Sequence, residues 1–186
     1  MNSKQHGFTM IELIVVIVIL GILAAVALPR FTNIQTDARV AKLNAARGAV
    51  LAASAMINGT VLVRGGVADA AACAGGAVLA SNSAGVTGTV CTASGIVNNV
   101  FGFPAGALNG IVDAAGLTTV FPATAIALTA EGYAATAVAG PPGVVTVQVT
   151  GGAATATPAT DCSFTYTQAA AAGAAPAIGV INRAGC

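Results

Sequence analysis

The feature that most constrains this chain is an apolar run close to its start. The run extends from Phe8 to Leu28, and Glu12 is its one charged residue. A helix rises about 1.5 Å per residue, so a run of this length spans a hydrocarbon layer of ~30 Å. The sequence therefore predicts a hydrophobic transmembrane helix over 8–28.

A cleavable secretory signal is the alternative interpretation of this run. Ala25-Val26-Ala27 would then be its small-x-small cleavage site. The apolar part of such signals is usually only about 7–15 residues long. A retained helix has to account for Glu12, because a carboxylate at membrane depth costs roughly 2.5–3.5 kcal/mol. We therefore expect a retained helix in which Glu12 has a charged partner.

The composition excludes several classes of protein. Of the 186 residues, 56% are hydrophobic and only 7% are charged, whereas about 25% is usual in a soluble domain. No basic patch is large enough for nucleic acid, so no nucleic-acid partner is expected. A single histidine and scattered acids indicate no catalytic group, no metal site and no cofactor. We predict a protein that is not an enzyme and that packs against copies of itself.

The residues after the apolar run favour a long amphipathic helix over 29–58. Apolar residues recur there at spacings of three and four, which predicts one buried stripe; its members are Phe31, Ile34, Ala38, Ala41, Ala45, Ala49, Ala52 and Met56. Asn58-Gly59 is the expected helix end. Asp37 has no cation three or four residues later, so we expect it to be a solvated residue.

The remaining sequence is rich in Gly, Ala, Thr and Val, and it predicts a linking loop region over 59–115 and a β-sheet head over 116–186. The alternating run 144–150 is the best strand; weaker strands are expected at 116–120, 133–138, 162–167 and 178–181, and a short helix at 111–115. Tyr133 and Tyr166 are expected to be packing residues. The predicted class is α+β, with a spine helix packed on a small antiparallel sheet of about four strands.

Gly7-Phe8-Thr9-Met10-Ile11-Glu12-Leu13, followed by the apolar run, resembles the type IVa-like prepilin signal of type IV pilins. The resemblance implies a leader peptide over 1–7, which prepilin peptidase removes by cutting between Gly7 and Phe8, and N-methylation of Phe8. It also implies that helix 8–28 is a filament-core helix as well as a transmembrane one. It implies a structural subunit that polymerises through helix 8–28 and supports adhesion, motility or surface attachment. The expected partners are other copies of the chain, the peptidase, an inner-membrane platform, an assembly ATPase and an outer-membrane pore.

A second resemblance concerns the start of the predicted spine helix. Pro29-Arg30-Phe31, Gln35 and Asp37-Ala38-Arg39 are most similar to mannose-sensitive haemagglutinin-type pilins. In related pili the stretch from Gly21 to Pro29 loses helicity on assembly. We expect the same here, because glycine and proline both weaken a helix.

Cleavage after Gly7 would leave a positive amine on Phe8. Glu12 could pair with that amine on a neighbouring subunit and so set the axial stagger between subunits. Pairing with the amine of its own chain is equally compatible with the sequence.

Four cysteines allow three disulfide pairings. We predict Cys73–Cys91 and Cys162–Cys186, of which the second would tie down the carboxy-terminal end. It would match the carboxy-terminal disulfide loop of related pilins. Bonded cysteines indicate the periplasm or the outside of the cell.

The resemblance implies a single-pass inner-membrane precursor with a periplasmic head, and then a pilus on a Gram-negative surface. The positive-inside rule points the other way, because Lys4 precedes the run and four cations follow it; these are Arg30, Arg39, Lys42 and Arg47. Two other functions remain open. One is a minor pilin or a type II secretion pseudopilin, and the other is a domain secreted behind an ordinary signal peptide.

Overall fold

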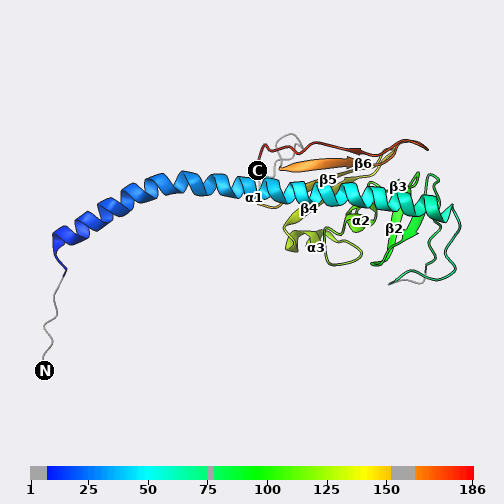
Figure 1. Cartoon of the computed structure of the whole chain (residues 1–186), viewed down its shortest axis with the longest axis horizontal. Helices are drawn as coiled ribbons and strands as arrows, with labels where there is room; N and C mark the ends of the chain where they lie inside the picture. The colour runs from blue at the N-terminus through cyan, green and yellow to red at the C-terminus, as the bar shows by residue number, and fades with distance from the viewer. Residues whose placement is uncertain (1–7, 75–77, 152–161) are drawn as a thin grey trace, which may run out of the picture. The chain divides into compact units, whose positions relative to one another are not determined.

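One long helix organises the whole chain. The computed structural model describes residues 8–74, 78–151 and 162–186, with the backbone alone for 29–33, so Gly7 lies outside it. Helix α1 (Met10–Arg64) is 55 residues long (Figure 1). The chain divides into two compact units, Met1–Ala38 and Arg39–Cys186, and α1 contributes to both.

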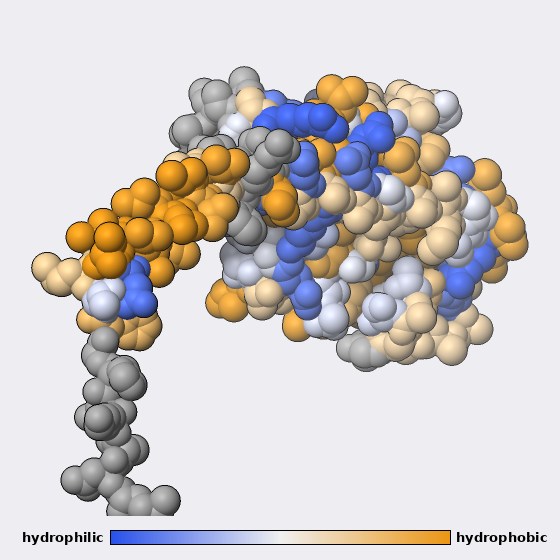
Figure 2. Space-filling model, turned by 60° about the vertical axis from the view of Figure 1, so that its left-hand side comes forward, coloured by the Kyte–Doolittle hydropathy of each residue, from blue (hydrophilic) through white to orange (hydrophobic). Residues whose placement is uncertain are grey.

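The first unit is the apolar part of α1. Every large apolar side chain from Phe8 to Leu28 is exposed, and Figure 2 shows this segment as an almost unbroken hydrophobic surface. The helix continues through Gly21 and Pro29 without a break. The predicted loss of helicity over 21–29 concerns assembled filaments, so it stays a prediction.

The second unit combines the rest of α1 with two antiparallel sheets (Figure 1). One sheet has the order β4-β5-β6-β7, and its strands are β4 (Tyr133–Val138), β5 (Val144–Val149), β6 (Ser163–Thr167) and β7 (Ala177–Ile178). The other has the order β1-β2-β3, from β1 (Gly88–Cys91), β2 (Ile96–Val100) and β3 (Phe103–Pro104). Three short helices lie between the sheets in sequence: η1 (Leu108–Val112), α2 (Asp113–Ala115) and α3 (Ala125–Ala130).

Two hydrophobic clusters attach α1 to these sheets. The larger cluster joins Leu43, Ala46 and Val50 of α1 to alternate residues of β5 and to β6; its strand members are Val145, Val147, Val149, Phe164 and Tyr166. The smaller cluster joins Ile57 and Val61 to Val90 of β1 and Val97 of β2. Successive turns of one helix face therefore cover first one sheet and then the other.

The predicted α+β class and the four-stranded sheet are confirmed, but the region 59–115 differs from the expectation. It contains the sheet β1-β2-β3 in place of a linking loop. Strand β2 was missed because it carries two asparagines, one of which, Asn99, is buried. Helix α1 continues past Gly59 to Arg64, since Val61 packs on β1 and β2 and this packing outweighs the ~1 kcal/mol cost of a helical glycine.

Two smaller strand predictions also changed. The strand predicted at 116–120 is wrong: Gly116 has a left-handed backbone with φ 60° and ends α2, and no strand forms there. The strand predicted at 178–181 is reduced to the two residues of β7, Ala177 and Ile178.

The predicted buried stripe of the spine helix is also wrong. The buried face consists of Val40, Leu43, Ala46, Val50, Ala53, Ile57 and Val61. Most members of the predicted stripe are exposed, among them Ala41, Ala45 and Met56. Apolar residues recur at helical spacing on both faces of the helix, so spacing alone does not choose between the two faces. The face with larger side chains is buried, because it removes more apolar area from water.

Tyr166 of β6 connects three elements of the second unit. Its side chain is fully buried, and its hydroxyl donates to the backbone carbonyl of Pro104 in β3 at 2.7 Å. Ser54 of α1 bonds the same side chain, and burial raises the pKa of Tyr166. The prediction that Tyr133 and Tyr166 are packing residues is confirmed, since both belong to or contact the larger cluster.

We predict that Tyr166→Phe destabilises the fold by roughly 1–3 kcal/mol, because the buried Pro104 carbonyl loses its donor. Thermal unfolding of the full chain in detergent measures the change. Tyr133→Phe is the matched control, since Lys42 lies over the ring of Tyr133, 4.4 Å from the ring centre, and the ring is retained. Equal melting temperatures for the two variants would contradict the prediction.

Candidate functional site

The candidate site is the exposed apolar helix at the start of α1. Two stretches of α1 are long and apolar enough to cross a membrane, Met10–Leu28 and Ile34–Arg64. The second is one-third buried, because one of its faces packs on the sheets. The first has no buried residue within the structure. An apolar surface of this size needs a lipid layer or another protein to cover it.

The helix begins with a reciprocal cap between Thr9 and Glu12. The backbone N–H of Glu12 donates to the Thr9 hydroxyl oxygen at 3.3 Å. The backbone N–H and the hydroxyl of Thr9 donate to Oε2 of Glu12 at 2.9 and 2.6 Å. This is a capping box, which satisfies N–H groups that the first turn of a helix leaves free. Among the described residues Oε1 of Glu12 has no hydrogen-bond partner.

Thr9 is a functional residue that the sequence reasoning missed. The signal was present, because Thr9-Met10-Ile11-Glu12 fits the pattern of a threonine followed three residues later by a glutamate. The geometry shows that Glu12 caps the start of the helix in addition to carrying a charge. Phe8, the residue before the cap, is 87% exposed.

The comparisons with known proteins match this same part of the chain. Residues 2–28 match the family model of the prokaryotic N-terminal methylation motif. A stretch of 53 residues is 48% identical to the type IV narrow pilus major component PilA5 of Thermus thermophilus, covering 28% of this chain and 46% of that protein. A stretch of 42 residues is 55% identical to the type IV major pilin protein PilE1 of Neisseria gonorrhoeae, covering 23% and 26%.

The amino-terminal segment is similar to that of type IV pilins. The type IV major fimbrial protein FimA of Dichelobacter nodosus is also similar, with 44% identity over 48 residues, 26% of this chain and 31% of that protein. The chain thus covers less than half the length of these relatives. No solved structure matches the chain. The finer resemblance to mannose-sensitive haemagglutinin-type pilins stays a prediction.

The carboxy-terminal region of the chain is held by a disulfide and by cations of α1. Cys162 is bonded to Cys186, as predicted. Three cations of α1 donate to backbone carbonyls of the head: Arg39 to Cys186 at 2.5 Å, Lys42 to Glu131 at 2.5 Å and Arg47 to Gly179 at 2.9 Å. By the positive-inside rule these three cations argue for a cytoplasmic head. In the structure each of them has a structural partner in the head.

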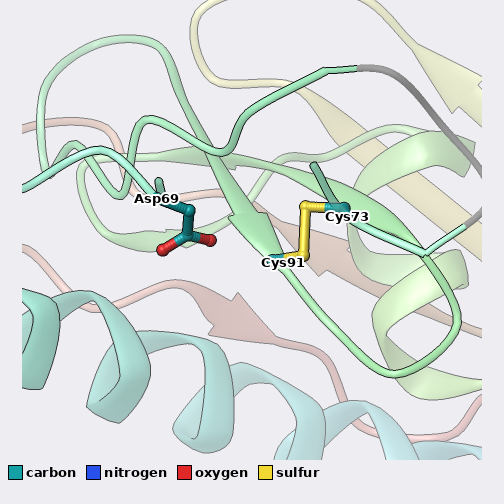
Figure 3. A group of neighbouring side chains, drawn as sticks. All are labelled: Asp69, Cys73 and Cys91. Carbon is teal, nitrogen blue, oxygen red and sulfur yellow. A yellow bond between two sulfur atoms is a disulfide. The ribbon is translucent and has the colours of Figure 1, made fainter. Parts of the chain in front are cut away.

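The second disulfide, Cys73–Cys91, lies beside a carboxylate, as Figure 3 shows. Ligand atoms of Asp69, Cys73 and Cys91 lie within 4.8 Å of one another. The sulfurs are bonded to each other, whereas a metal would need them as thiolates. Asp69 is also engaged by Arg64 at 3.0 Å and by Asn82 at 2.8 Å. The arrangement therefore fixes the disulfide loop to the end of α1.

Asp113 is a buried acid at the start of α2. Its Oδ1 accepts from the backbone N–H of Ala123 at 2.6 Å, whereas Oδ2 is buried without a hydrogen-bond partner. Burial raises the pKa of Asp113 above its ordinary value of 3.8, and the Ala123 N–H opposes this shift. The folded state therefore favours the protonated acid more than the unfolded state does.

This shift predicts how stability depends on pH. A raised folded-state pKa stabilises the fold at low pH, and that contribution is lost as the pH rises from about 3.8 through the folded value. Asp113→Asn keeps an oxygen for Ala123 and removes the titration. The variant should therefore lose less stability than the unmodified chain between pH 3 and pH 7. Melting curves of the full chain in detergent at both pH values measure the difference, and parallel losses would contradict it.

Proposed function

We propose that this chain is the structural subunit of a type IV pilus, polymerising through the helix 8–28. The observation that carries the proposal is the apolar start of α1, which no other part of the described chain covers. The match to the N-terminal methylation motif supports it, as do relatives whose names describe major pilins. The helix is covered first by the membrane and then by the helices of other copies.

The proposed route to the filament starts with cleavage between Gly7 and Phe8 and with N-methylation of Phe8. The new amine lies one residue before the capping threonine and four residues before Glu12. Oε1 of Glu12 is then available to the amine of a neighbouring copy while Oε2 stays with Thr9. Such a pair neutralises both charges in an apolar filament core and fixes the register of the copies.

The head supplies the outer surface of the proposed filament and supports adhesion, motility or surface attachment. Its two disulfides fit an oxidising compartment, which supports a periplasmic head before assembly. The assembly partners are proposed by resemblance alone: prepilin peptidase, the inner-membrane platform, the assembly ATPase and an outer-membrane pore of a Gram-negative cell.

Mass spectrometry of the amino terminus in sheared surface material tests the proposal. The expected result is abundant filaments whose subunits begin with N-methylated Phe8. The same terminus found only in the inner membrane would instead favour a minor pilin or a pseudopilin. A mature terminus at Leu28 would identify an ordinary secretory signal and overturn the proposal.

Two substitutions at Glu12 separate its charge from its role in the cap. Glu12→Gln keeps a side chain that completes a capping box but removes the charge, whereas Glu12→Ala removes both. Because the pair with the Phe8 amine needs the charge, both variants should be cleaved normally and should make few or no filaments. Filament yield by electron microscopy and the mature terminus by mass spectrometry are the measurements. Normal filaments from Glu12→Gln would show that Glu12 acts through the cap alone.

A further inference from the structure

A small concavity lies between α1 and the carboxy-terminal segment of the head. Its volume is about 180 Å³, and its lining consists of Asn44, Arg47, Val180, Ile181 and Arg183. Two guanidinium groups therefore share one concavity without a lining acid. This is unusual in a chain of which only 7% is charged.

Both arginines have N–H groups that donate to no described residue. Arg47 uses Nε for the carbonyl of Gly179 at 2.9 Å, and its two terminal nitrogens have no partner among the described residues. Arg183 is exposed, and its side chain makes no hydrogen bond or ion pair within the described part of the chain. The other described cations of the second unit have partners. Arg39 and Lys42 donate to backbone carbonyls, and Arg64 forms an ion pair with a carboxylate.

The backbone around Arg183 is held in place although its side chain is free. The preceding residue, Asn182, forms a bridge with Ser163 in both directions, at 2.8 and 3.3 Å. The backbone N–H of Cys186 donates to the Arg183 carbonyl at 3.2 Å, and Cys186 is bonded to Cys162. The concavity is therefore a fixed cationic feature of the head.

One carboxylate of the described chain is left without a partner. Glu12 bonds Thr9, Asp69 bonds Arg64, Asp113 bonds Ala123 and Glu131 bonds Thr119. Asp37 is exposed, and no hydrogen bond or ion pair of its side chain occurs within the described residues. Asp37 therefore has no partner within the described part of its own chain.

We propose that Asp37 of a second copy of the chain binds in the concavity formed by Arg47 and Arg183. The inference rests on the proposed filament, which brings copies side by side at high local concentration. A carboxylate is the group that a pair of guanidiniums recognises best, and it is small enough for the site. Val180 and Ile181 offer apolar surface for the rest of the approaching side chain. The contact joins the amphipathic half of one spine helix to the head of a neighbour.

Charge reversal tests this contact in cells that make the chain as their only pilin. Arg183→Glu and Asp37→Arg should each lower the yield of sheared filaments by roughly tenfold or more, because each places like charges face to face across the contact. The double variant restores an opposite-charge pair and should recover most of the yield. Arg183 is the better position to change than Arg47, which also bonds Gly179.

Glu131→Arg is the matched control. It makes the same change in net charge as Asp37→Arg, and Glu131 is also exposed. Combined with Arg183→Glu, it should not restore filaments. Recovery with this control, no recovery in the double variant, or full yield from Arg183→Glu alone would each overturn the proposal.

Cross-linking tests the same contact if the reversed variants fail to accumulate in the membrane. Arg183→Lys keeps the charge and supplies an amine that a carbodiimide can join to a carboxylate. Filaments of this variant should give a cross-linked dimer whose peptides contain position 183 and Asp37. A cross-link to another acid, or none, would overturn the contact. Absence of filaments from the unmodified chain would instead overturn the proposed function.

Discussion

The structure depends on how the apolar surface of one helix is covered. The first half of α1 exposes every large apolar side chain, whereas the second half buries a continuous face against two sheets. Both halves belong to one unbroken helix. The head covers its own part of α1, and the remainder needs a lipid layer or another protein to cover it.

The head reaches a packed state with very few large side chains. Only 4% of the residues are aromatic, and the larger cluster relies on branched residues of β5 around Phe164 and Tyr166. Polar contacts supplement this packing at its margins. Cations of α1 bind backbone carbonyls near the edges of the head, and the Tyr166 hydroxyl joins β6 to β3. Two disulfides, Cys73–Cys91 and Cys162–Cys186, add covalent links to this packing.

The sequence predicted the parts of this structure that local chemistry determines. The apolar run predicted the exposed helix over Met10–Leu28, and Glu12 stood out because a lone acid in such a run needs a special reason. Strand β5 was predicted because its valines alternate with polar residues. The stripe of α1 was predicted wrongly because apolar residues recur at helical spacing on two faces, and the face with the larger side chains packs on the sheets. Strand β2 was missed because burial of Asn99 depends on its bond to the Ser83 carbonyl, which no local pattern reveals.

The contact between Arg39 and Cys186 has a consequence for the order in which the chain forms its structure. The two residues are 147 positions apart. At about 5–20 residues per second, Cys186 is synthesised about 7–30 s after Arg39. Throughout that interval the second half of α1 exists without the disulfide that closes the head, and for most of it without β6. The apolar first half is complete long before, so early insertion of that half would hold the unfinished chain at the membrane surface until its own head can cover it.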